Sequence, residues 1–195
     1  MRILIIGATG TIGSAVGKML EQEHEVIRAS RNSALAIDLE DTDSIARALT
    51  SLPAVDAVVS CAASVPMARF LDGTDEDFTG SLRAKLFGQL SLVRHAARRL
   101  TDGGSITLTA GAHPIHGAAA GSLANAGLEE FVRAAAAEMP RRIRLNAVSP
   151  GWVRETQVRF GVADPDGVGA DDVAQEYREA VEGSVNGMTL VPRHR

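Results

Sequence analysis

The residues near the amino terminus that could do chemistry are glycines at three-residue spacing, Gly7, Gly10 and Gly13. They follow an apolar run of strand length, Arg2 to Ile6, and lead into a helix predicted from Ile12 to Gln22. Gly7 permits a tight turn, Gly10 lets backbone amides approach a pyrophosphate, and Gly13 lets the helix pack closely on the strand. An ordinary strand-to-helix turn needs one glycine at most, so the pattern predicts a dinucleotide-binding turn with the anion at the helix N-terminus. Further predicted cofactor contacts in this turn are Thr9, Thr11 and Ile12.

The elements that position this turn alternate between strand-like and helix-like periods along the chain. After the first strand, the predicted strands are His24–Ala29, Ala34–Ile37, Val55–Ser60, Gly104–Thr109, Ile143–Val148 and Met188–Val191. After the first helix, the predicted helices run from Asp41 or Thr42 to Leu52, from about Asp75 to Leu100, through a Gly/Ala-rich stretch to Met139, and from Asp171 to Glu182. Repeated strand, crossover and strand units imply a parallel sheet that helices cover on both faces. We therefore predict an α/β fold of the doubly wound Rossmann type, with about seven strands in a single domain spanning residues 1–195.

Composition and charge narrow the class of protein. With 195 residues, 45% of them hydrophobic, the chain can build one sizeable core. A net charge of −4 gives no reason to expect nucleic acid or an anionic membrane surface as a partner, and the arginine clusters at 98–99 and 141–144 are interpreted as charges that complement helix C-termini. The single cysteine, Cys61, excludes an internal disulfide and fits a reducing compartment, and no metal-ligand set is predicted. No leader-like segment precedes the first strand and no apolar run reaches membrane-spanning length, so the predicted location is the cytoplasm.

Further motifs follow the later strands. Asp38-Leu39 comes after the short third strand, SCAA at 60–63 after the fourth, and NAVSPG at 146–151 after the sixth. Together with the glycine turn, this order and spacing resemble the short-chain dehydrogenase/reductases along nearly the whole chain. The resemblance implies an oxidoreductase that uses a nicotinamide cofactor and acts on a small-molecule substrate.

The resemblance also assigns roles to these motifs. Asp38 and Leu39 would receive the adenine, and the segment 146–151 would run beside the nicotinamide. SCAA at 60–63 stands where the family usually has Asn-Asn-Ala-Gly. The resemblance implies further cofactor contacts, and some of these residues are also expected from their place at the carboxyl edge of the sheet. They are Cys61, Ala62, Ala63, Thr109, Asn125, Pro150, Gly151 and Val153.

The end of the second strand bears on the choice of cofactor. A dinucleotide fold that prefers NAD places a carboxylate there, which binds the adenosine ribose and repels a 2′-phosphate. Here that position is Ser30, and Arg31 follows it. A hydroxyl and a guanidinium suit a phosphate dianion, so NADP(H) is predicted in preference to NAD(H). The alternative is that Arg31 is a plain surface arginine.

The catalytic positions are where the chain departs from the family pattern. In the family a Ser follows the fifth strand, and a Tyr and a Lys, four residues apart, lie on the next helix. There the Tyr is the acid–base group, the Lys lowers its pKa, and the Ser orients the carbonyl. The resemblance places Gly111, Gly121 and Asn125 at these positions, so the three side chains are missing. The one tyrosine, Tyr177, is predicted to be a packing residue on a late helix, and Lys85 occupies the position of a family Asn in the long helix.

Other side chains could supply the missing chemistry. Reduction of a carbonyl builds alkoxide charge, which needs a proton donor or an electrostatic partner within about 3 Å. Lys85 is the first candidate, since partial burial beside a nicotinamide would lower its pKa; the equal alternative is a structural lysine bonded to backbone carbonyls where the helix bends. Ser122 and Asn125 share a helix face and complete the predicted catalytic set with a hydroxyl and an amide. His113 and His116 are loop histidines, for which solvation is the simpler interpretation.

Two functions remain open from the sequence. In the first, the chain is an NADP(H)-dependent oxidoreductase with rearranged catalytic groups, and the segment from Trp152 to Gly169 covers a partly apolar substrate. In the second, it binds the dinucleotide without turnover, as a redox-state sensor or binding protein. The resemblance also implies a homodimer or homotetramer, with an apolar stripe on the long helix at the contact; the alternative is that this stripe covers the sheet. The stripe consists of Leu86, Leu90, Val93 and Ala97.

Overall fold

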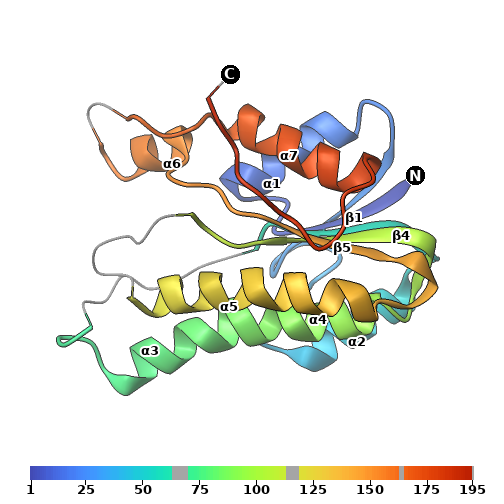
Figure 1. The fold of residues 1–195 in the computed structure, drawn as a ribbon, viewed down its shortest axis with the longest axis horizontal. Coiled ribbons are helices and arrows are strands. Elements are labelled where there is room, and N and C mark those ends of the chain that lie inside the picture. Colours follow the sequence, from blue (N-terminus) through green and yellow to red (C-terminus); the bar gives the residue numbers. More distant parts are fainter. Residues whose placement is uncertain (63–69, 113–118, 163–164, 195) are drawn as a thin grey trace.

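One parallel sheet forms the centre of the molecule (Figure 1). The computed structural model describes residues 1–62, 70–112, 119–162 and 165–194. The sheet has six strands in the order β2-β1-β3-β4-β5-β6, and every neighbouring pair is parallel. The strands are β1 (Arg2–Ile6), β2 (Glu25–Ala29), β3 (Val55–Ser60), β4 (Leu100–Thr109), β5 (Arg144–Val148) and β6 (Thr189–Leu190). The predicted doubly wound α/β fold is confirmed.

Helices cover both faces of the sheet. The helical segments are α1 (Thr11–Leu20), α2 (Thr42–Ser51), α3 (Asp75–Ser81), a π-helix (Leu82–Phe87), α4 (Gly88–Ala96), α5 (Ala119–Ala135), α6 (Arg154–Arg159) and α7 (Ala170–Glu182), with 3₁₀ turns at Ala136–Glu138 and Pro140–Arg142. Figure 1 shows α1, α6 and α7 above the sheet and α2 to α5 below it. β1 is buried on both sides, because Ile3 and Ile5 join the apolar cluster under α1 and α7 while Leu4 and Ile6 join the opposite one. Within the described ranges, no helix combines the length and apolar character needed to cross a bilayer.

The segment Ala34–Ile37, predicted as a strand, forms no ladder. The pairing it makes in the structure is a bridge between Ser30 and Ala36. The hydroxyl of Ser33 accepts a hydrogen bond from the backbone N–H of Ser30 and donates one to the carbonyl of Leu35, both at 2.8 Å. These local bonds satisfy backbone groups that a ladder would otherwise use. The segment is therefore a bend with one bridge, and the described part of the sheet has six strands where about seven were predicted.

The long helix predicted from about Asp75 to Leu100 is divided. α3 passes into the π-helix at Leu82–Phe87, which passes into α4, and the chain has already entered β4 at Leu100. A π-turn widens the helix with i→i+5 bonds and is frequent at functional sites. Apolar periodicity does not register this change, so the sequence predicted one continuous helix.

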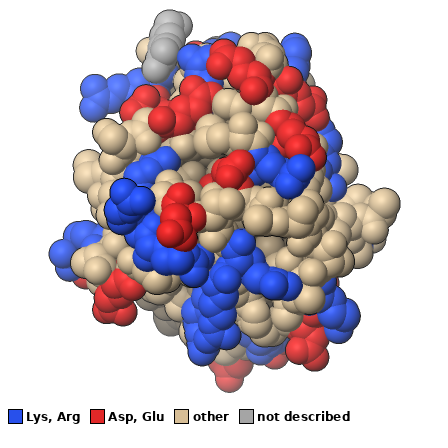
Figure 2. Space-filling model, turned by 90° about the vertical axis from the view of Figure 1, so that its right-hand side faces the viewer, with Lys and Arg blue, Asp and Glu red and all other residues tan. Residues whose placement is uncertain are grey.

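In one of the two arginine clusters, Arg141 and Arg144 bond carbonyls near helix ends, as predicted. Arg141 donates to the carbonyls of Ala97 and Leu100 just after α4, at 2.9 and 2.8 Å. Arg144 donates to carbonyls at the end of α7, at 2.8 Å each. These bonds satisfy carbonyls that lack an intrahelical partner. Figure 2 looks onto the edge where the strands begin, and basic and acidic side chains are both spread over that face.

Candidate functional site

The glycine turn between β1 and α1 lies against the end of β3. Gly7 has a φ of +78°, and a Cβ on it would come within 2.6 Å of the backbone N of Ala62. Only glycine combines this left-handed backbone with such a close approach. A Cβ on Gly13 would lie 2.2 Å from the carbonyl O of Gly7, so the predicted close packing of helix and turn is confirmed.

Gly10 is in a different situation. Its backbone is extended, with φ −78° and ψ 170°, a conformation open to any residue. The one atom near an added Cβ is the carbonyl O of Gly7 at 3.4 Å, so the space beyond is open. No side chain caps α1, and no acidic residue stands in its first turn. Uncapped amides beside an open space that a Cβ would fill make a cradle that fits a pyrophosphate.

The residues predicted to bind the adenosine half of the cofactor include Ser30 and Arg31, which follow β2 and lie beside the glycine turn. The backbone N–H groups of Gly7 and Ala8 both donate to the carbonyl of Ala29, at 2.9 and 3.2 Å, so the end of β2 abuts the glycine turn. Ser30, half-buried, and Arg31, exposed, come directly after it. By contrast, the guanidinium of Arg28 lies along α1, where it donates to Glu21 at 2.7 Å.

The other residues predicted to bind the adenosine half, Asp38 and Leu39, differ in their burial. Asp38 is half-buried, and its carboxylate accepts the backbone N–H of Glu40 at 3.0 Å. Leu39 is buried, and a Cβ on Gly88 would lie 2.5 Å from its carbonyl O, so α4 packs directly on it. In the glycine turn, Thr9 is exposed, Thr11 is half-buried, and Ile12 packs against the apolar cluster under α1.

A directed hydrogen-bond chain lies beneath the ends of β3 and β4. Thr109 Oγ1 donates to the carbonyl of Ser60, and Tyr177 OH lies 2.6 Å from Thr109 Oγ1. Thr109 has one hydroxyl proton, so Tyr177 must donate to it. Cys61 lies beside Tyr177. Burial raises the pKa of Cys61 to about 12, which keeps the thiol protonated. Tyr177 thus packs in the core, as predicted, and also joins α7 to the floor of the site.

Lys85 is a buried cation in the π-helix. It is 7% exposed, and its Nζ donates to the carbonyl of Ala110 at 3.2 Å. Burial lowers the pKa of its ammonium from 10.5 to about 8, and the negative charge of Glu129 opposes part of that change. The bond to a backbone carbonyl fits the structural interpretation of Lys85, and the lowered pKa is the property that the catalytic interpretation requires.

Gln89, one turn after Lys85, holds the end of β4 in place. Its amide nitrogen donates to the carbonyls of Lys85 and Thr109, at 3.0 and 3.1 Å. Its amide oxygen accepts the backbone N–H of Thr109 at 3.0 Å. Gln89 is fully buried, so one side chain satisfies backbone groups of both the π-helix and the strand.

The polar face of α5 closes the other side of this site. Ser122, half-buried, and Asn125 lie three residues apart on it, as predicted. The amide nitrogen of Asn125 would be 2.8 Å from a Cβ on Gly111, so it stands where a side chain at position 111 would begin. Asn125 Oδ1 is buried and lacks a hydrogen-bond partner among the described residues. An acceptor in this state fits a ligand hydroxyl or N–H donor. Further along this face, Glu129 Oε1 accepts from Ser149 Oγ at 2.7 Å.

The lowered pKa of Lys85 predicts a stability change at alkaline pH. The pKa of Lys85 is about 8 in the folded state and 10.5 when unperturbed, so between these values the unfolded chain binds more protons. Rising pH then favours the folded state, and the free energy of unfolding should increase by up to about 3 kcal/mol relative to Lys85→Met. Chemical denaturation of both proteins at several pH values measures this difference. Curves of the wild type and Lys85→Met that stay parallel across this pH range would contradict it.

The segment after β5 carries the remaining predicted contacts. The carbonyl of Pro150 accepts the backbone N–H of Ala112 at 2.8 Å, and Gly151 follows it, half-buried. Val153 is 5% exposed, forms a bridge with Val168 and belongs to the core. The apolar side chains that stay exposed here are Trp152, Val158, Phe160 and Val162. Ala63, His113 and His116 lie outside the described residues.

The apolar stripe predicted for a subunit contact covers the sheet instead. Val93 and Ala97 are buried in the cluster beneath α4, and Leu86 and Leu90 pack against that cluster. The alternative interpretation of the stripe is therefore the correct one. On the same helical layer, the large apolar side chains that remain exposed are Phe87 and Leu123.

Sequence reasoning missed the polar residues that hold Lys85. Gln89 falls on the buried face of an apolar helix, and a polar residue on such a face is a signal of a specific bond. Glu129 is seven residues after Ser122 and four after Asn125, so all of them lie on one helix face. The spacing can be read from the sequence, but the sequence does not show that Ser149, at the end of β5, is the partner of Glu129.

The chain is similar in sequence to known reductases. A family model described as enoyl-(acyl carrier protein) reductase matches residues 8–181. Versicolorin reductase 1 of Aspergillus parasiticus is 30% identical over 153 residues, which cover 72% of this chain and 56% of the relative. The chain thus spans little more than half the length of the curated relatives it matches first.

Solved structures match over almost the whole chain. The protein lin1944 from Listeria innocua is 36% identical, with a TM-score of 0.93 and 98% of each chain covered. A small-chain dehydrogenase in complex with NADPH is 27% identical, with a TM-score of 0.86, covering 98% of this chain and 95% of that one.

Proposed function

Since the chain belongs to the short-chain dehydrogenase/reductase family, we propose that it is an NADP(H)-dependent oxidoreductase that interconverts a carbonyl and an alcohol on a small-molecule substrate. The observation that carries this proposal is the open cradle at Gly10, beside the uncapped N-terminus of α1. The solved relative that holds NADPH supports the choice of cofactor. Residues 1–195 would act as one dinucleotide-binding domain, because a single sheet receives strands from Arg2 to Leu190.

The residues proposed to hold the dinucleotide surround the carboxyl edge of the sheet. A bound nicotinamide cofactor supplies the hydride in this chemistry. Around the pyrophosphate we propose Gly7, Thr9, Gly10, Thr11, Ile12 and Gly13; around the adenosine half, Ser30, Arg31, Asp38 and Leu39; and toward the nicotinamide, Cys61, Ala62, Ala63, Thr109, Asn125, Pro150, Gly151 and Val153.

Lys85, Asn125 and Ser122 are the proposed reacting and orienting groups. Lys85 Nζ holds a proton at neutral pH and has a pKa close enough to neutrality to exchange it. Its ammonium also stabilises negative charge on an oxygen of the substrate. Oδ1 of Asn125, which has no partner among the described residues, would accept a hydrogen bond from a ligand hydroxyl, and the hydroxyl of Ser122 lies on the same face.

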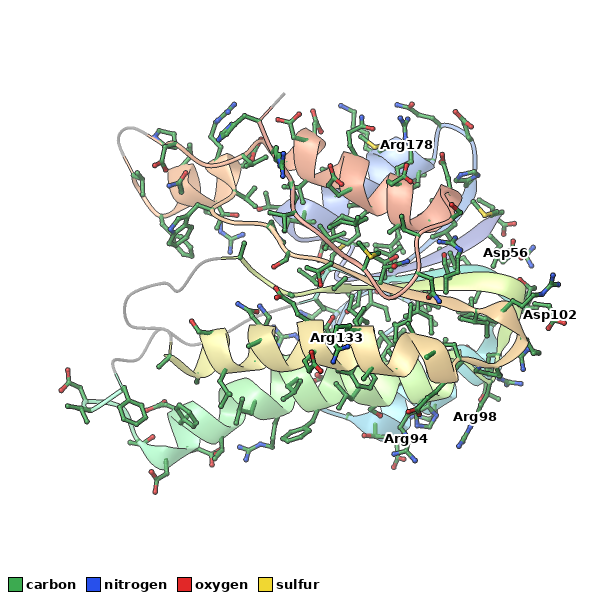
Figure 3. The ribbon with its side chains drawn as sticks, in the orientation of Figure 1. Asp56, Arg94, Arg98, Asp102, Arg133 and Arg178 are labelled. Atoms are coloured by element: carbon green, nitrogen blue, oxygen red, sulfur yellow. The ribbon has the colours of Figure 1, made fainter. Side chains whose placement is uncertain are left out.

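Arg31→Ala tests the choice of cofactor. The exposed guanidinium would lose its charge-assisted bonds to the 2′-phosphate, so affinity for NADPH should fall roughly 10- to 100-fold while affinity for NADH stays nearly unchanged. Titration calorimetry with both cofactors measures the two constants. The control is Arg133→Ala, which removes an exposed arginine of α5 that pairs with Glu130 (Figure 3). Equal losses for the two cofactors would refute the assignment.

Binding without turnover is the second candidate function. It is favoured by Gly111 and Gly121, which offer no side chain at positions where the family places its serine and tyrosine. A screen of carbonyl compounds for NADPH oxidation separates the two candidates. Binding of NADPH without oxidation by any compound would favour a redox-state sensor.

We also propose that the chain forms a homo-oligomer. The exposed Phe87 and Leu123 lie on the helical layer that the family uses for subunit contacts, and they replace the buried stripe as the apolar residues available there. Light scattering in solution tests this part.

A further inference from the structure

Lys85 and Glu129 are anchored at neighbouring positions of two paired strands. β4 and β5 pair in register up to Thr109, and the next residues along them are Ala110 and Ser149. Adjacent strands lie about 4.8 Å apart, so these two residues stand one strand spacing from each other. Lys85 Nζ donates to the carbonyl of Ala110 at 3.2 Å, and Ser149 Oγ donates to Glu129 Oε1 at 2.7 Å. The anchors of the cation and of the carboxylate therefore lie side by side at the ends of β4 and β5.

The surroundings make this charge pair effective. Lys85 is 7% exposed and Glu129 is half-buried, so water screens the interaction mainly from the side of the carboxylate. The attraction acts through space, because the hydrogen bond described for each group goes to a different partner. The hydrogen bond from Ser149 already holds the carboxylate of Glu129 in one orientation. Less conformational entropy is therefore lost when Glu129 pairs with Lys85.

Two other charge pairs lie on the elements packed against Lys85, and α4 carries Arg94 and His95 in its last turn. Arg83, on the π-helix itself, pairs with Glu76 of α3. On α5, Glu130 pairs with Arg133. β4 and β5 present a backbone carbonyl and a hydroxyl there, and His113 and His116 lie outside the described residues. Glu129 is the group whose charge acts on Lys85.

We propose that Glu129 is the counter-ion and positioning residue of Lys85: its carboxylate, fixed by Ser149, keeps the buried ammonium charged and directed at the end of β4. Without this carboxylate, burial alone would favour the neutral amine. The amine would then have no proton to give to an alkoxide and no charge to stabilise it. The role of Lys85 in turnover rests on the proposed function, whereas its charge state can be measured without substrate.

The composition of the chain makes that measurement direct. Lys18 and Lys85 are its two lysines, and Lys18 is exposed on α1. Protein labelled with ¹³C at lysine Cε therefore gives one signal from each, and Lys85→Met assigns them. In the wild type, the Lys85 signal should titrate with a midpoint near pH 8.

Glu129→Gln keeps the shape and the bond to Ser149 but removes the charge. The Lys85 midpoint should fall by about one pH unit or more. The matched control is Glu130→Gln, which changes the adjacent glutamate on α5 and should leave the Lys85 midpoint unchanged. Glu129→Asp retains the charge on a shorter side chain and should produce a smaller fall, so it serves as the test if Glu129→Gln does not fold. An unchanged Lys85 midpoint in Glu129→Gln, or an equal fall in Glu130→Gln, overturns the proposal.

Turnover separates this proposal from the proposed function. If both hold, the alkaline limb of the pH profile of kcat should move to lower pH in Glu129→Gln by the same amount as the Lys85 midpoint. If the midpoint moves and the profile does not, Glu129 is the counter-ion, and Lys85 is not the proton donor. If the midpoint does not move, the counter-ion assignment fails whatever the activity.

Discussion

Lys85→Met is expected to lower kcat roughly 10²-fold or more and to leave the affinity for NADPH unchanged. The loss corresponds to one acid–base or oxyanion-stabilising group, and methionine keeps the apolar stem of the side chain in its buried place. Single-turnover measurements of NADPH oxidation give the rate of the chemical step, and calorimetry gives the affinity.

Stability must be measured alongside this rate. Methionine leaves the carbonyl of Ala110 without the bond from Nζ, so some change in unfolding free energy is expected. Rates are therefore normalised to folded protein, and Lys18→Met is the control for loss of a lysine. Activity that changes only in proportion to folded protein would make Lys85 a structural residue.

Gly10→Val is expected to abolish binding of both NADPH and NADH while the protein stays folded. The extended backbone of Gly10 accepts a valine, and the new side chain points into open space rather than into the protein. That space is where the pyrophosphate would approach the amides of α1, so the loss falls on both cofactors equally. Calorimetry on the folded variant measures it, with circular dichroism as the test of folding.

The neighbouring glycines define the contrast for this variant. Gly7→Val and Gly13→Val should destabilise the fold itself, because a Cβ at either position lies within 2.6 Å of backbone atoms. Gly10→Val thus isolates binding from stability. Unchanged affinity in the folded Gly10→Val protein would place the dinucleotide elsewhere.

Local requirements made the first half of the site predictable. A buried parallel strand is continuously apolar, and the turn after it needs glycine for a left-handed backbone at Gly7 and for close packing at Gly13. Both signals lie within residues 2–13, so sequence alone predicted the turn and its position in the fold. The arginine bonds at helix ends were predictable for the same reason, since every helix leaves its last carbonyls unpaired.

Contacts between distant residues made the second half unpredictable. Ser149 is 20 residues from Glu129, and Tyr177 is 68 residues from Thr109, so their hydrogen bonds depend on how the strands and helices pack. The segment Ala34–Ile37 was predicted as a strand because its composition fits one, but the hydroxyl of Ser33 satisfied the backbone locally. Placement of Lys85 depends on a π-helix, which no apolar period specifies.

The contact between Gly111 and the amide of Asn125 has a consequence for mutational history. A side chain at position 111 and the present place of that amide exclude each other, because a Cβ there would lie 2.8 Å from its nitrogen. The effect of a serine at position 111 therefore depends on which residue occupies position 125, and the two positions are epistatic. A serine at position 111 is therefore accommodated either by a change of residue at position 125 or by rotation of the Asn125 amide away from it.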